Sequence, residues 1–114
     1  MTAHSKTRSS PPLKPQWFQI LLALADGRRH GQGIMAEVLR QTEGAMKLWP
    51  TSLYGSLRAL DEAELLRESP IEESDGDRRR FYELTEEGRV ALASEVARLE
   101  RTVALARRKK VLDS

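Results

Sequence analysis

Cysteine is absent from this 114-residue sequence, and histidine occurs only at His4 and His30. Without thiols the chain forms no disulfide and no thiolate metal site, and two histidines are too few for a histidine-built metal cage. The sequence also has no apolar run near the ~20 residues that a membrane-spanning helix needs, and no signal-peptide core. These absences predict a cytoplasmic protein with no metal, no cofactor and no membrane partner.

The residue patterns that carry catalysis are missing as well. The sequence has no glycine-rich loop that would cradle a phosphate, and no pair of Glu and His residues at metal-ligand spacing. Its 17 acidic residues are scattered along faces that we expect to be exposed. The sequence therefore predicts that this protein is not an enzyme.

Positive charge, in contrast, is clustered. The net charge is only +2, but basic residues gather in residues 1–15, in residues 98–110 and in the triplet Arg78-Arg79-Arg80. Such clusters attract a polyanion such as nucleic acid, although basic ends are also common as solvated tails. Charge alone leaves both interpretations open.

The length suits one domain. Residues 1–14 are rich in Ser, Thr, Lys, Arg and Pro, which predicts a disordered basic arm. We expect a folded domain over residues 15–84, a long helix over residues 85–110 and a short tail over residues 111–114.

Apolar residues at spacings of three and four predict three short helices, over about 15–24, 31–42 and 50–63. Pro15 begins the first helix, and Gly44 ends the second. The third begins either with Pro50 as its first residue or with Thr51 as its cap, and the pattern does not separate these two starts. His30, just before the second helix, is expected to cap it or to satisfy a core group.

The periodicity then changes to that of strands. Residues 65–69 and 79–84 are extended in pattern, and the Asp75-Gly76 step between them favours a tight turn. These segments predict an antiparallel hairpin. Thr85 is expected to cap the long helix that follows.

An apolar stripe runs along that last helix at alternating spacings of four and three, which is typical of a coiled-coil seam. We expect it to form a homodimer interface, although a stripe this short could instead pack onto its own domain. Its members are Leu92, Val96, Leu99, Val103 and Ala106.

Three helices, a two-stranded hairpin and a long helix are the element order of a winged helix-turn-helix domain. The fold class is therefore mainly α, with a small β component (α+β). In this arrangement the third helix enters the major groove of DNA, and the hairpin, or wing, touches the neighbouring backbone.

The sequence also resembles the PadR-type transcriptional regulators. The resemblance lies in residues 20–24 followed by 30–34, in residues 51–57 with the leucines after them, and in the stretch 78–88. It covers about residues 17–110 and is strongest with the short subgroup that ends in one dimerisation helix. It implies a bacterial, cytoplasmic repressor that binds a palindromic operator in double-stranded DNA as a homodimer. An unknown small-molecule effector is a further partner to test, with Trp17 as the candidate residue for its pocket.

Residues on the third helix outside its leucine face are the candidates for DNA contact: Thr51, Ser52, Tyr54, Gly55 and Arg58. Hydroxyl groups near a helix start suit phosphates, and an arginine reads guanine or grips phosphate. Gly55 lets the backbone approach a duplex, or else packs against another helix.

On the wing, Arg78, Arg79 and Arg80 are expected to contact phosphates, although nearby acidic residues would suit a merely solvated wing. Trp17 and Trp49 are expected in the core or in an interface. The alternative function is a winged-helix module that binds protein without specific DNA binding. Steep salt dependence of binding would distinguish DNA from such a partner.

Overall fold

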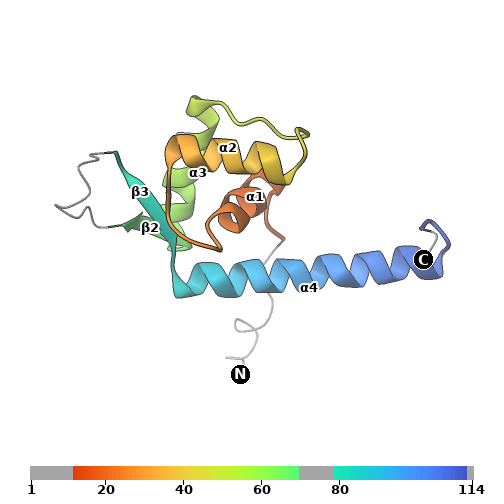
Figure 1. Ribbon diagram of the computed structural model, residues 1–114. Helices are drawn as coiled ribbons and strands as arrows, with labels where there is room; N and C mark the ends of the chain where they lie inside the picture. Colours follow the sequence, from red (N-terminus) through yellow and green to blue (C-terminus); the bar gives the residue numbers. More distant parts are fainter. Residues whose placement is uncertain (1–11, 70–78, 113–114) are drawn as a thin grey trace, which may run out of the picture.

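The computed structural model describes residues 12–69 and 79–112. Within these ranges the chain forms four helices and three short strands (Figure 1). In chain order they are α1 (Pro15–Ala23), β1 (Arg29–His30), α2 (Gly31–Gln41), α3 (Pro50–Glu62), β2 (Leu66–Ser69), β3 (Phe81–Leu84) and α4 (Glu86–Arg108). This is the winged helix-turn-helix order, so the predicted fold class is confirmed. Residues 1–11 of the predicted basic arm (1–14), the turn around Asp75, and Arg78 lie outside the described residues.

The helix starts follow the capping chemistry of the sequence. His30 caps α2 because its Nδ1 accepts a hydrogen bond from the backbone N–H of Gly33 at 3.1 Å. Thr85 caps α4 because its Oγ1 accepts from the backbone N–H of Gly88 at 3.0 Å. At α3, Pro50 is the first helical residue and Trp49 is the N-cap, with no hydrogen bond from its side chain. The two starts that the sequence left open are thereby resolved in favour of Pro50.

The sheet has the strand order β1-β3-β2, with both pairs antiparallel. The predicted hairpin is confirmed, since Leu66 pairs with Leu84 and Ser69 with Phe81. No pattern in the sequence predicted β1. A strand of two residues has no periodicity to detect, and it exists because Arg29 and His30 pair with β3.

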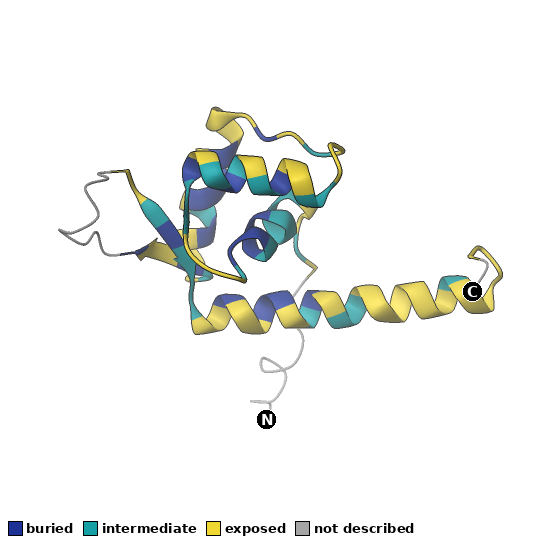
Figure 2. Ribbon diagram, viewed as in Figure 1, coloured by how far each residue is buried: buried dark blue, intermediate teal, exposed yellow. Residues whose placement is uncertain are grey.

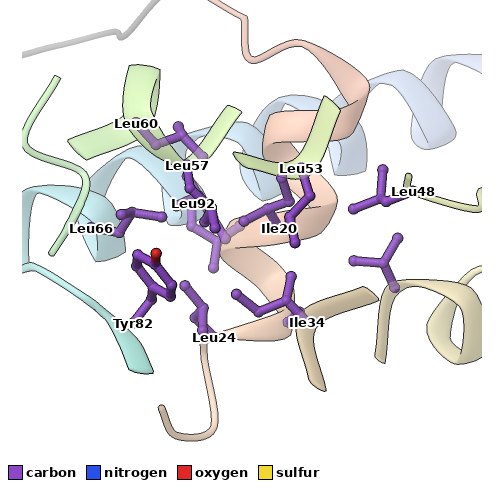
Figure 3. Packing of buried hydrophobic residues seen from close by; sticks show 13 residues of the cluster. Ile20, Leu24, Ile34, Leu48, Leu53, Leu57, Leu60, Leu66, Tyr82 and Leu92 are labelled. Carbon is purple, nitrogen blue, oxygen red and sulfur yellow. The ribbon is translucent and has the colours of Figure 1, made fainter. Parts of the chain in front are cut away.

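A single core joins all these elements. Side chains from α1, α2, α3, the β2–β3 hairpin and the start of α4 converge on it (Figure 3). Its fully buried members include Ile20, Leu24, Ile34, Leu53 and Leu60. Tyr82 on β3 and Leu92 on α4 close it from the hairpin side and the long-helix side. The core fixes how α3 and the wing lie relative to each other.

The long helix α4 has two different halves. Its first turns cover the core, and Gly88 lies so close to the backbone carbonyl of Leu65 that an added Cβ would overlap that oxygen. Its C-terminal half extends beyond the domain and is mostly exposed (Figures 1 and 2). None of the helices in the described ranges is both long and apolar enough to cross a membrane.

Candidate nucleic-acid interface

Helix α3 separates its residues into a buried and an exposed side. Leu53, Leu57 and Leu60 are at most 2% exposed and face the core (Figure 3). The five predicted contact residues of this helix are all exposed: Thr51, Ser52, Tyr54, Gly55 and Arg58. The structure therefore brings them together on one outward surface, as the helical spacing predicted.

The beginning of α3 is braced from behind by α1. The side-chain amide of Gln16 donates to Ser56 Oγ at 2.6 Å and to the backbone carbonyl of Ser52 at 3.3 Å. Ser56 is buried, so this brace lies on the protein side of the helix. The hydroxyl of Ser52 donates to the carbonyl of Trp49 at 3.1 Å. Sequence reasoning missed Gln16, because a single polar residue on an amphipathic helix gives no sign of its partner.

Gly55 lies on the open side of α3. A Cβ added at this residue would meet no atom within 4 Å. The alternative that Gly55 packs against another helix therefore does not hold in the single chain. A glycine in mid-helix costs about 0.5–1 kcal/mol of folding free energy relative to alanine, and no contact in the described structure offsets that cost.

Tyr54 links α3 to the start of α2. Its phenol lies against Gly31, where any added Cβ would overlap the hydroxyl. The same ring lines a hollow of about 270 Å³ together with His30, Gln32, Arg79 and Arg80. This hollow thus joins the first turn of α2, a tyrosine hydroxyl and two wing arginines. Helix starts, hydroxyls and guanidinium groups are all donors that suit a phosphate.

A second hollow, of about 240 Å³, lies between α3 and the wing. Arg58 of α3 and Arg80 of the wing line it, and so do the carboxylates of Asp61 and Glu68. Arg80 Nε lies 3.1 Å from Glu68 Oε2, in an ion pair whose two side chains are more than half exposed. Each arginine therefore has an acidic neighbour in this hollow. Glu68 is the second residue that sequence reasoning missed, since it belongs to a strand whose pairing places it opposite Tyr82.

Tyr82 also lines that hollow. Burial raises the pKa of its hydroxyl, while the hydrogen bond with Arg80 acts in the opposite direction. The phenol therefore stays neutral near pH 7. On the other side of β3, the guanidinium of Arg28 lies 4.7 Å from the ring centroid of Phe81, and the His30 ring meets Phe81 edge-on at 5.3 Å. These contacts fix the root of the wing to the turn before α2.

The predicted dimer residues differ in burial along α4. Leu92 belongs to the core, and Ala106 is half-buried. Val96, Leu99 and Val103 remain 38–42% exposed in the single chain. The domain's own core therefore covers only the beginning of the apolar stripe.

An open groove of about 460 Å³ runs beside this stripe, lined by Leu22, Ala93, Val96 and their neighbours on α4. Trp17 is half-buried on α1 and packs against the core, with the ammonium of Lys14 5.1 Å from its ring centroid. It is not among the residues that line this groove, and the effector pocket at Trp17 stays a prediction.

Trp49 is 61% exposed, so it is not the core residue that the sequence allowed. Within the described residues, no group of three His, Cys, Asp or Glu side chains is placed to hold a metal ion.

Comparison with known proteins places this chain in a family. Residues 20–94 match the model of the transcriptional regulator PadR-like family. An uncharacterized 37.1 kDa protein in transposon TN4556 of Streptomyces fradiae is 42% identical over 82 residues, which are 72% of this chain. The chain spans only 22% of that relative's length.

Solved structures show the same fold. A transcriptional regulator from Clostridium thermocellum is similar with a TM-score of 0.66 and 23% identity, over 81% of this chain and 89% of that one. Bacillus subtilis PadR, solved in complex with operator DNA, is similar with a TM-score of 0.63 and 17% identity, over 73% of this chain and 47% of that one. With the family model matching well over half of the sequence, this chain belongs to the PadR-like family of transcriptional regulators, which are not enzymes.

Proposed function

We propose that this protein is a cytoplasmic, sequence-specific repressor that binds an inverted-repeat operator as a homodimer. The observation that carries the proposal is the outward face of α3, where Thr51, Tyr54, Gly55 and Arg58 lie exposed beside the wing arginines. The operator complex of Bacillus subtilis PadR, a protein of the same fold, supports DNA as the partner.

In this proposal α3 enters the major groove. Arg58 contacts a base edge or a phosphate, and Gly55 allows the helix backbone to come close to the duplex. The hollow between Tyr54, the start of α2 and Arg79 receives a phosphate of the same strand. Arg80, and Arg78 outside the described residues, would add contacts that position the protein but carry little sequence information.

The homodimer follows from the exposed half of the stripe on α4. Val96, Leu99 and Val103 form an apolar row on a 23-residue helix that extends beyond its own domain. A second copy of α4 would cover this row together with Leu92 and Ala106. Pairing would place two α3 helices about 34 Å apart, one turn of DNA, which matches an inverted repeat. Occupying a promoter in this way would block transcription.

The experiment that tests this function is selection of DNA from a random pool with the purified protein, followed by binding of the selected duplex across a salt series. We expect enrichment of an inverted repeat and an affinity that falls steeply with salt, because phosphate contacts release counterions. Failure to enrich any sequence, with only weak binding that salt abolishes, would overturn the proposal. That result would favour the winged-helix module that binds protein.

A further inference from the structure

The segment that leads into α3 presents a charged aromatic pair to solvent. Leu48 is 4% exposed and belongs to the core, whereas its neighbour Trp49 is 61% exposed. Trp49 has extended backbone angles, so successive side chains in this segment point to opposite sides. The ammonium of Lys47 lies 4.6 Å from the centroid of the Trp49 ring. Anchoring of Leu48 in the core thus turns Lys47 and Trp49 outward together.

A tryptophan in this position has no structural purpose that the described contacts reveal. Its ring is outside the core cluster, and its side chain makes no capping hydrogen bond to α3. A large exposed aromatic ring lacks the hydrophobic stabilisation of burial, and tryptophan, which has an apolar body and a polar N–H, is enriched at interaction sites. The lysine above the ring adds a cation next to it.

The charge around the pair selects the kind of partner. Between Glu43 and Asp61 the chain has two cations, Lys47 and Arg58, and no Asp or Glu, and of these two only Arg58 shares a hollow with an acid, Asp61, in the described part of the chain. The pair directly precedes Pro50, the first residue of the helix proposed to enter the major groove. An apolar protein partner would bury the ammonium of Lys47 without a counter-charge, which is unfavourable. A polyanion would pair with it, so the charge favours a polyanion as the partner.

We infer that Lys47 and Trp49 form a further DNA contact, on the sugar-phosphate strand that borders the major groove occupied by α3. The Lys47 ammonium and the indole N–H of Trp49 donate to a phosphate, and the indole ring packs against the deoxyribose. This inference rests on the proposed function and adds a backbone contact outside α3 and the wing. Because no base is read, the contact strengthens binding to all sequences alike.

Substitution of each residue tests the inference. We would compare Trp49→Ala, Lys47→Ala and the ring-preserving Trp49→Phe with the wild type, using the selected duplex and a scrambled duplex at several salt concentrations. The matched control is Lys109→Ala, which removes an exposed lysine at the far end of α4. Trp49→Ala and Lys47→Ala are each expected to weaken binding to both duplexes roughly tenfold. Trp49→Phe should weaken it less, and Lys47→Ala should lower the slope of log K against log salt by about 0.9.

The outcomes separate this inference from the proposed function. If the wild type selects and binds an operator but the Lys47 and Trp49 variants bind as tightly as Lys109→Ala, the inference is wrong and the function stands. If the wild type binds no operator, both are wrong. Thermal unfolding of each variant should match the wild type, because both side chains lie outside the core.

Fluorescence gives a second readout that does not depend on affinity. Trp17→Phe leaves Trp49 as the only tryptophan. Titration with operator duplex should then change the Trp49 emission in step with the binding seen by anisotropy of a labelled duplex. Binding without any change in emission would overturn the inference.

Discussion

The hydroxyl of Tyr54 on α3 occupies the position where a side chain on Gly31, the first residue of α2, would begin. Gly31 is buried, whereas Tyr54 is 46% exposed and lines both hollows beside the wing. The absence of a side chain at Gly31 therefore decides where the phenol lies. If Tyr54 contacts DNA, Gly31 contributes to that contact without touching the duplex.

Replacement of Gly31 with alanine is accordingly expected to weaken operator binding about as much as Tyr54→Ala does. The phenol is the end of a flexible side chain and moves away, so the free energy of unfolding should change by less than about 1 kcal/mol. The measurement is a double-mutant cycle on operator affinity. Gly31→Ala should have little further effect in a Tyr54→Ala background, because residues in contact couple. Additive losses would show that Gly31 acts independently of Tyr54.

Gly55→Ala is predicted to change stability and DNA affinity in opposite directions. The added methyl group meets open space, so the helix gains about 0.5–1 kcal/mol from the better propensity of alanine. The same methyl group would obstruct close approach of α3 to a duplex. Denaturant unfolding and operator titration of the same preparation check both effects. Affinity equal to that of the wild type would remove Gly55 from the interface.

Most of the fold could be predicted because its signals are local. The spacing of Leu53, Leu57 and Leu60 defines the inner face of α3, and the caps at His30 and Thr85 follow from the residue types. β1 could not be predicted, since two residues become a strand only when β3 lies beside them. The sequence also could not decide whether Pro50 or Thr51 begins α3. That depends on the backbone angles of Trp49, which residue types and spacing do not predict.

The candidate interface was predictable residue by residue, but its arrangement was not. Helical spacing placed Tyr54 and Arg58 outside the leucine face. Contacts between separate elements could not be predicted from residue spacing. Examples are the hydrogen bond from Gln16 to Ser56 and the ion pair of Arg80 with Glu68. The exposure of Trp49 was also hidden, because a tryptophan beside a leucine is as compatible with a core as with a surface.

Replacement of Leu99 with glutamate is predicted to separate the dimer while leaving the domain folded. Leu99 is 42% exposed in the single chain, so the domain itself loses little by the change. In the proposed dimer the same residue would bury a charge without a partner, which is strongly unfavourable. Sedimentation should show a monomer for Leu99→Glu and a dimer for Val90→Glu, an exposed position on α4 outside the stripe. A dimer in both variants would exclude this seam.

Glu95 is predicted to hold the chain before α1 against α4. Glu95 is buried, and its carboxylate accepts from the backbone N–H of Leu13 at 3.2 Å and pairs with Arg98 at 2.6 Å. Glu95→Ala leaves a part-buried N–H without this acceptor, so we expect a loss of about 1–3 kcal/mol in unfolding free energy. Glu95→Gln keeps an oxygen that accepts from Leu13 and should lose less. If denaturant unfolding shows equal losses of stability for Glu95→Ala and Glu95→Gln, the ion pair with Arg98 contributes more to stability than the hydrogen bond from Leu13.

Glu68 is predicted to weaken DNA binding in the wild type, because its carboxylate shares a hollow with Arg58 and pairs with Arg80. The pair is exposed, so breaking it costs at most about 1 kcal/mol of stability. Glu68→Gln removes a negative charge beside the proposed phosphate track and frees Arg80, which should raise affinity about threefold to fivefold at low salt. Arg80→Ala should lower affinity, and the gain from Glu68→Gln should shrink as salt increases. Unchanged affinity in both variants would mean that this side of the wing does not face DNA.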